Sequence, residues 1–169
     1  MNYLFQFLYK NEMNLFVLSK SKRRIARYMV DKHIGKMILE SVQMLSTTKR
    51  VLDPGANFGP IYKLVHKNHP VTKWVRASYL NYLWLLDLVD EMHKEWQYRY
   101  GDKTHKSYIV AQFLREHPPP LEAFEFEEMT PFALAMPDIY KTDDAIESYR
   151  AYYRTKPAAW KNREKPYWF

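Results

Sequence analysis

The segment VTKWVRASYLNYLWLLDLVDEMHKEWQYRY, residues 71–100, decides the fold. It follows Pro70, a residue favoured in the first turn of a helix, and it stops at Gly101, a common residue just past a helix end. Its apolar side chains are spread around the whole helical circumference, which is typical of a helix that is buried on every side. The sequence therefore predicts a long central helix over 71–100.

A second helix is predicted over 32–50, with Asp31 as its N-cap. At about 100° per residue, Ile34, Ile38 and Leu45 share one face, and we expect this face to pack against the central helix. The opposite arc is polar, so the helix is predicted to have two different faces. The polar arc carries His33, Lys36, Glu40, Gln43 and Thr47.

Shorter elements complete an all-α, single-domain architecture. A basic helix over 22–30 is capped by Ser21, a helix covers 106–115, and a last helix runs from Thr142 to about Thr155. Residues 15–18 form a lone strand or a buried lead-in, and we expect the aromatic tail after Thr155 to pack back on the domain. Met13 reads like a second start, so 1–12 is predicted to be an extension and 13–169 the helical domain. Only 4 Gly in 169 residues argue against a turn-rich all-β fold.

The composition favours some classes of function for this protein and excludes others. The chain has 26 Lys and Arg against 19 Asp and Glu, a net charge of +7, which suits a polyanion such as DNA or a nucleotide. Zero Cys excludes a disulfide framework and thiol catalysis. No apolar run reaches the ~18 residues needed to span a bilayer, so we expect no membrane partner and a soluble, intracellular protein. Gly-rich phosphate loops, nucleophile elbows and dinucleotide fingerprints do not occur, and no cofactor is expected.

The polar arc of 32–50 has two readings. His33, Lys36 and Glu40 lie on successive turns of the helix and could supply a base, an amine nucleophile and a carboxylate. Alternatively, Lys36 and Glu40 form an ordinary surface pair worth only ~0.3–0.5 kcal/mol, and the spacing alone favours this second reading. We predict that the arc borders a pocket.

A metal site is a weaker alternative. His66 and His69 are three residues apart, and His33 and Glu40 could join them as ligands. No zinc-binding spacing is matched, and His69 before Pro70 suits a helix cap. We therefore expect no metal.

Interleaved basic and aromatic residues suggest a nucleic-acid interface, because Arg contacts phosphates and Tyr stacks on unpaired bases. Arg76 and Asn81 lie on the central helix, where a buried Arg76 would need an anionic partner such as Glu40, Asp138 or a substrate phosphate. Many of these aromatic residues fit a core equally well. The last helix contributes Tyr149, Arg150, Tyr153 and Arg154.

Two resemblances carry these observations further. The layout from MNLFVLSKSKRR at 13–24 to the final KPYWF resembles a group of small uncharacterised proteins of phages and large DNA viruses. That resemblance implies a viral, DNA-centred setting, in an infected host cell or a virion. A non-enzymatic DNA-binding or virion-associated protein is the alternative to an enzyme in that setting.

The second resemblance is to the T-even phage type of pyrimidine dimer DNA glycosylase. It rests on Asp31-x-His33 followed seven residues after the His by Glu40, on the first long helix behind a short lead-in. The resemblance implies a compact all-α enzyme without metal, in which Glu40 is the catalytic carboxylate and His33 its neighbour. Leu39 and Gln43 stand where that family has Arg.

In that family the nucleophile is the α-amine of the processed N-terminus, which forms an imine with the deoxyribose. This chain begins at Met1, and a start at Met13 would place Asn14 next, which is larger than the residue that aminopeptidase processing favours. Lys36 is therefore an alternative amine, with Glu40 stabilising the developing oxocarbenium charge. The resulting hypothesis is a DNA N-glycosylase, or a related base-modifying or nucleotide-directed enzyme, whose target base the sequence does not name.

Overall fold

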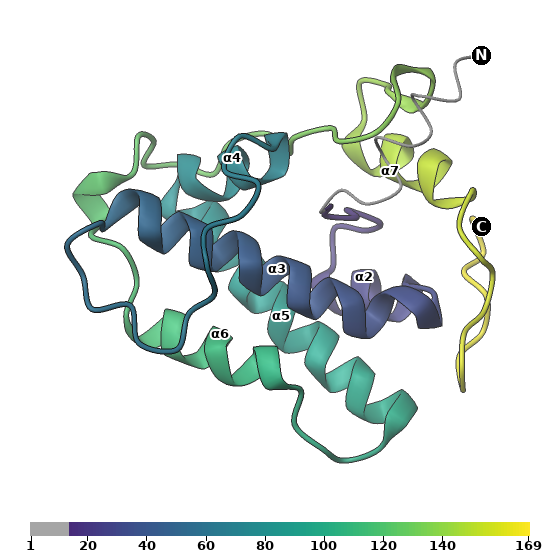
Figure 1. Cartoon of the computed structure of the whole chain (residues 1–169). Coiled ribbons are helices and arrows are strands. Elements are labelled where there is room, and N and C mark those ends of the chain that lie inside the picture. The colour runs from purple at the N-terminus through teal and green to yellow at the C-terminus, as the bar shows by residue number, and fades with distance from the viewer. Residues whose placement is uncertain (1–13) are drawn as a thin grey trace.

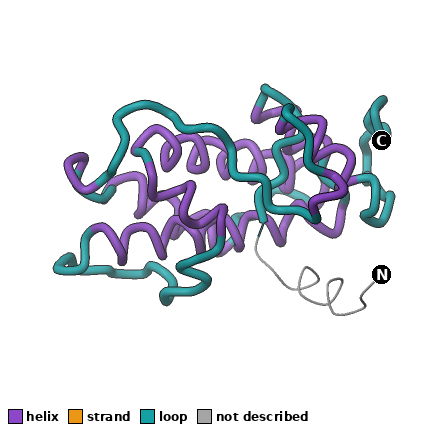
Figure 2. The backbone as a smooth tube through the Cα atoms, turned by 90° about the horizontal axis from the view of Figure 1, so that it is seen from above, coloured by secondary structure: helices purple, strands orange, loops and turns teal. Residues whose placement is uncertain are grey.

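A computed structural model describes residues 14–169 and confirms the all-α fold. Helices joined by loops make up this range, and no strand occurs in it (Figure 2). The elements are α2 (Lys22–Tyr28), α3 (Asp31–Leu52), α4 (Pro70–Ala77), α5 (Tyr79–Tyr100), α6 (Lys106–Glu116), the 3₁₀ helices η1 (Leu121–Ala123) and η2 (Asp138–Tyr140), and α7 (Ala145–Tyr153).

Helix α5 is the central element, because α2, α3, α4 and α6 all pack against it (Figure 1). Its side chains Tyr82, Leu85, Leu88 and Val89 are completely buried. The prediction of a buried central helix, made from apolar residues on every side, is confirmed for 79–100.

The prediction of one continuous helix over 71–100 is wrong, because the chain breaks at Ser78. This residue is extended (φ −144°, ψ 144°), and its hydroxyl accepts a hydrogen bond from the N–H of Leu80 and so caps α5. The N–H of Phe126 donates to the carbonyl of Ala77 at 3.0 Å, which fastens the break to the loop after α6. The hydrophobic pattern did not reveal the break because both halves are apolar.

Helix α3 packs against α4, α5 and α6. Ile34, Ile38 and Leu45 are fully buried, as predicted. Asp31 is not the N-cap, which is Val30. The Asp31 carboxylate lies in the first turn, where it accepts the N–H of Lys161 at 2.8 Å and the Nη1 of Arg99 at 3.0 Å.

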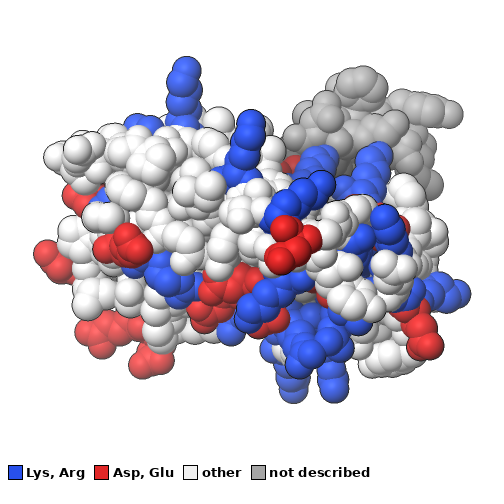
Figure 3. Space-filling view, turned by 90° about the horizontal axis from the view of Figure 1, so that it is seen from below, with Lys and Arg blue, Asp and Glu red and all other residues white. Residues whose placement is uncertain are grey.

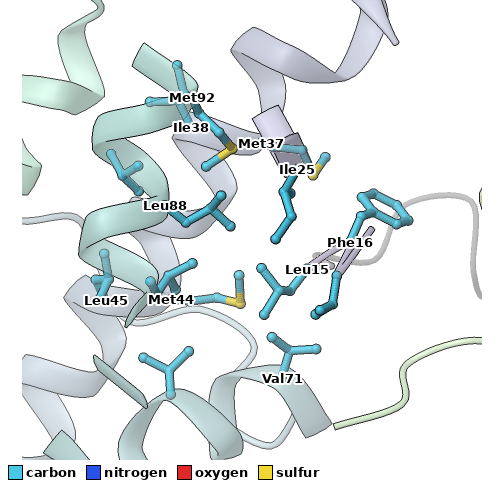
Figure 4. Close-up of a cluster of buried hydrophobic side chains, with 14 of the residues drawn as sticks. Leu15, Phe16, Ile25, Met37, Ile38, Met44, Leu45, Val71, Leu88 and Met92 are labelled. Carbon is cyan, nitrogen blue, oxygen red and sulfur yellow. The ribbon is translucent and has the colours of Figure 1, made fainter. Parts of the chain in front are cut away.

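The lead-in over 14–18 is buried and lies outside any strand. Leu15 points into the apolar cluster near Ile25, Met44 and Val71 (Figure 4). Because this segment also runs over the arc of α3 that contains His33 and Glu40, that arc is covered by protein. The alternative of a buried lead-in is the one that the structure supports.

Helix α7 starts after the N-cap Asp144, two residues later than predicted from Thr142. The tail beyond it packs back on the domain, as expected: the Nε1 of Trp160 donates to the carbonyl of Tyr28 at 2.9 Å, and Trp168 is buried. Within 14–169, no helix has the length and apolarity that a bilayer-spanning segment requires.

Candidate active site

The side chain of Glu40 lies at the centre of the candidate site. It is 8% exposed, and each of its oxygens faces a nitrogen. The backbone N–H of Asn14 donates to Oε2 at 3.3 Å, and the Lys36 ammonium lies 3.6 Å from Oε1. The first contact spans 26 residues of sequence, so it depends on the lead-in being folded over α3. A nitrogen of residue 14 and the amine of Lys36 therefore share one carboxylate.

Burial raises the pKa of the Glu40 carboxyl, and this effect outweighs the opposing influences of the Lys36 charge and the Asn14 N–H. A carboxylate that is both desolvated and next to an amine, here that of Lys36, is suited to exchanging a proton with it or to facing a developing positive charge. Lys36 itself is exposed.

His33 is also buried, at 8% exposure, two helical turns before Glu40. Its ring stacks on Phe16 of the lead-in, with centroids 5.1 Å apart and planes 8° from parallel. Its Nδ1 lies 3.0 Å from the hydroxyl of Tyr153, which also accepts the N–H of Val30. Burial lowers the pKa of His33 to about 4, and the charges of nearby lysines contribute, so the ring is neutral at neutral pH. His33 thus holds the lead-in in place.

Three lysines gather around this part of α3: Lys32, Lys36 and Lys156. The pKa of Lys156 is lowered first by burial and then by the charges of Lys36 and Lys32. In the part of the chain that the structure describes, neither Lys32 nor Lys156 has a carboxylate within ion-pair distance. Like charges placed together without counter-charges favour the binding of an anion.

A cavity of about 560 Å³ lies near Glu40, although Glu40 itself does not line it. Its wall includes Ala135, whose carbonyl accepts the side-chain amide of Asn14 at 2.8 Å, and His66, whose charge acts on the Glu40 carboxyl. The rest of the wall is partly cationic, with Lys67 and Lys141. No residue of the polar arc of α3 lines this cavity, and neither does Arg76, so the expectation that the arc borders a pocket is not confirmed; the cavity only adjoins residues that contact or act on Glu40 and Asn14.

The predicted nucleic-acid residues of α7 hold the site together from inside the protein. Tyr149 is fully buried, and its hydroxyl donates to the carbonyl of Ala133 at 2.6 Å, next to the segment that binds Asn14. Arg150 donates through Nε to the carbonyl of Leu18 at 2.9 Å, at the end of the lead-in. Tyr153, also fully buried, contacts His33. As buried or inward-bonded groups they are ill placed to contact DNA, and α7 positions the lead-in.

The remaining predicted nucleic-acid residues are spread over the molecule. Asn81 is fully buried, and its side-chain amide donates to the carbonyl of Trp74 and to the hydroxyl of Thr130, both at 2.7 Å. Arg76 is half-buried and pairs with neither Glu40 nor Asp138; it donates to the carbonyl of Lys67. Arg154 is exposed and donates to the carbonyl of Trp168 at 2.8 Å. The structure does not bring these three residues together.

The alternative metal set is not assembled. Among residues 14–169, no group of three or more His, Cys, Asp and Glu side chains could hold a metal ion. His69 is the N-cap of α4 and accepts the N–H of Val71 through Nδ1 at 3.2 Å. This is the capping role that Pro70 suggested.

Residues 13–108, more than half of the chain, match the model of the family described as pyrimidine dimer DNA glycosylase. The chain therefore belongs to that family of DNA-directed glycosylases. Comparison with curated proteins and with solved structures finds no match for it. The matched region begins at Met13 and includes the lead-in, α3 and Glu40. The further resemblance to proteins of phages and DNA viruses remains an expectation.

Sequence reasoning missed Asn14, Lys32 and Lys156 as site residues. A signal for Asn14 was present, because it directly follows Met13, the candidate second start. Lys32 lies four residues before Lys36, and so on the same helical face. Lys156 lies at least 116 residues after the site residues of α3 in the sequence, and only the fold brings it near them.

Proposed function

We propose that the protein is a DNA N-glycosylase that attacks C1′ of a deoxynucleotide with an amine held against Glu40. The observation that carries the proposal is the pair of nitrogens on the two Glu40 oxygens, at 3.3 and 3.6 Å. An amine that attacks C1′ displaces the base and leaves an imine with the opened sugar. As a carboxylate, Glu40 would first stabilise the positive charge that develops on the sugar as the bond to the base breaks. It would then take up the proton that the attacking amine loses and pass it to the displaced base.

We infer that the amine is the α-amine of Asn14 in a form of the protein that begins at this residue, which requires a processing step that accepts a residue larger than those that aminopeptidase favours. The nitrogen of Asn14 already lies at hydrogen-bond distance from Glu40 Oε2. An α-amine is in general a weaker base than a lysine amine, so a larger fraction of α-amines is neutral near neutral pH. Because only the neutral amine is a nucleophile, this difference favours the α-amine over Lys36.

The lysine group of Lys32, Lys36 and Lys156 would bind the phosphates next to the target nucleotide. Lys32 and Lys36 lie on the part of α3 that contains His33, and Lys156 lies close to them, just after α7. A DNA backbone bound to these lysines would therefore pass close to Glu40. The cavity lined by His66 and Lys141 offers space beside the reacting sugar. In this proposal His33 positions the lead-in and takes no part in proton transfer.

The family description makes a pyrimidine dimer the first substrate to test. Leu39 and Gln43 lack the charge of the arginines that flank the equivalent Glu in the T-even phage type. Leu39 is exposed and Gln43 is half-buried, so both can face a ligand. We therefore propose a tolerant lesion specificity, to be examined on pyrimidine dimers and on modified thymines and cytosines.

The test is strand cleavage of duplexes that carry each lesion, with two forms of the protein: the full chain and a chain that begins at Asn14. We expect cleavage by the second form and at least ~100-fold less by the full chain, in which the Asn14 nitrogen is an amide. The variant Lys36→Arg, which keeps the charge and removes the primary amine, should retain activity in the shorter form. Activity of the full chain that is lost in Lys36→Arg would instead assign the nucleophile to Lys36.

A further inference from the structure

A second cationic cleft, of about 310 Å³, lies between α2, the C-terminal half of α5 and the tail. Four cations from these three elements line it: Arg23 and Arg27 from α2, Lys94 from α5, and Arg163 from the tail. None of these residues belongs to the Glu40 site or to its cavity.

The cleft keeps a positive charge after its internal pairs are counted. Its carboxylates are Glu91 and Glu95, so the four cations leave a net charge of +2. Glu95 is bound by both Arg163, through two hydrogen bonds of 2.9 Å, and the buried Arg99 at 2.9 Å. Glu91 pairs with Lys94 at 3.2 Å. The surplus charge is that of the two arginines of α2.

Arg23 and Arg27 have no carboxylate within 4.0 Å among the described residues. They are four residues apart on one helix, an arrangement in which like charges destabilise the helix. The first turn of α2 contains no acidic residue to offset them. An anion in the cleft would remove this repulsion.

Arg163 and Tyr98, which both line the cleft, pack against each other. Arg163 stacks over the ring of Tyr98 at 3.7 Å, and the Tyr98 hydroxyl donates to the carbonyl of Asn162 at 3.2 Å. Tyr98 remains 53% exposed. Guanidinium groups beside an exposed aromatic ring suit a sugar-phosphate backbone, since the first bind phosphate and the second packs on a sugar or base.

The two cationic regions lie at different parts of the fold. The Glu40 cavity is built from the loop before α4 and the segment before α7, whereas the second cleft is built on α2 and α5 (Figure 1). Viewed from below, Lys and Arg side chains project together from one edge of the molecule (Figure 3).

We propose that the cleft between α2, α5 and the tail is a second DNA-binding surface, which takes the phosphate backbone of a duplex segment other than the one at Glu40. The proposal rests on the proposed function only for the identity of the polyanion. An enzyme with two such surfaces can hold one segment while it engages another, and so transfer between segments without first dissociating.

The test is the number of short, undamaged duplexes that one full-length chain binds, measured by native mass spectrometry and calorimetry. We expect two for the unmodified protein and one for Arg23→Ala/Arg27→Ala. The matched control is Lys63→Ala/Lys106→Ala, which removes the same charge from two exposed positions outside both clefts and should leave two. At duplex concentrations high enough to fill the weakened second site of the variant, loss of two phosphate contacts should reduce the salt dependence of the second binding step by about 1.8 in log–log slope.

Lys94→Ala changes a residue on a different helix and should also weaken the second binding step. This result would show that the effect does not come from a folding defect confined to α2. Binding of a single duplex by the unmodified protein, an equal effect of the control variant, or an Arg23- and Arg27-dependent preference for phosphatidylserine vesicles over DNA would each overturn the proposal. Single-turnover cleavage at saturating enzyme should be unchanged in Arg23→Ala/Arg27→Ala, and a loss of that rate would place these residues at the catalytic interface instead. If two duplexes bind but no lesion is cleaved, the glycosylase proposal fails and the second surface stands.

Discussion

Replacing His33 by Gln should make the stability of the protein less sensitive to acid. Burial, helped by the charges of Lys156, Lys36 and Lys32, lowers the pKa of His33 from 6.5 to about 4 in the folded state. Between these values the unfolded chain binds a proton that the folded protein does not. Stability therefore falls as the pH drops from about 6.5 to about 4, and the effect is absent above 6.5.

The two pKa values set the magnitude. Between pH 7.5 and pH 4.5, proton binding by the unfolded chain should cost the folded protein roughly 2–3 kcal/mol through His33 alone. All other titratable groups are present in both proteins. Their contributions therefore cancel when the acid-induced loss of unfolding free energy of the variant is subtracted from that of the parent. Urea unfolding at the two pH values gives the required four free energies.

A matched control is His117→Gln, because His117 is exposed at the end of α6. For His117→Gln, the acid-induced loss of unfolding free energy should differ from that of the parent by much less than it does for His33→Gln. A value below about 0.5 kcal/mol for His33→Gln would refute the reasoning, since the ring would then be protonated as readily in the folded protein as in the unfolded chain. The consequence for function is direct: a protonated His33 would loosen Phe16 and with it the lead-in that brings Asn14 to Glu40.

Three further substitutions test the roles of Glu40, of the buried Arg99 and of the lysines near the site. Glu40→Gln should lower the cleavage rate by about 10²–10⁴-fold without lowering Tm at pH 7, because ionised Glu40 with its raised pKa opposes folding at that pH; a large Tm loss would contradict this. Arg99→Met, which leaves the buried carboxylate of Glu95 with less compensation, should cost about 3–5 kcal/mol in urea unfolding, and a cost under 1 kcal/mol would show the network to be dispensable. Lys32→Ala/Lys156→Ala should reduce the salt slope of lesion-DNA binding by about 1.8, whereas a slope equal to that of the parent would remove these lysines from the interface.

Periodicity predicted the parts of the fold that depend on one helix at a time. Ile34, Ile38 and Leu45 were assigned to the core because their spacing places them on one face. The break at Ser78 was not predicted because both halves are apolar, and because one contact at the break is made with Phe126, which is distant in the sequence. A local pattern contains no information on such a contact.

The candidate site was predictable in part for the same reason. The spacing of His33, Lys36 and Glu40 placed them on one arc of a helix, and the structure keeps them there. That the arc is covered by Asn14 and Phe16, and not by water, follows from the path of the lead-in over α3. Tyr149 and Tyr153 were assigned to DNA because basic and aromatic residues alternate along α7, a pattern that core packing produces equally well.

In the proposed reaction, a DNA sugar becomes bonded to the amine of Asn14 beside Glu40. Borohydride reduces an imine to a stable amine, so adding it during reaction of the chain that begins at Asn14 with lesion-bearing DNA should trap a covalent adduct. Peptide mapping should place this adduct on the N-terminal nitrogen of Asn14, and Glu40→Gln should strongly reduce its yield. An adduct on Lys36, or the absence of any adduct while cleavage proceeds, would contradict the account.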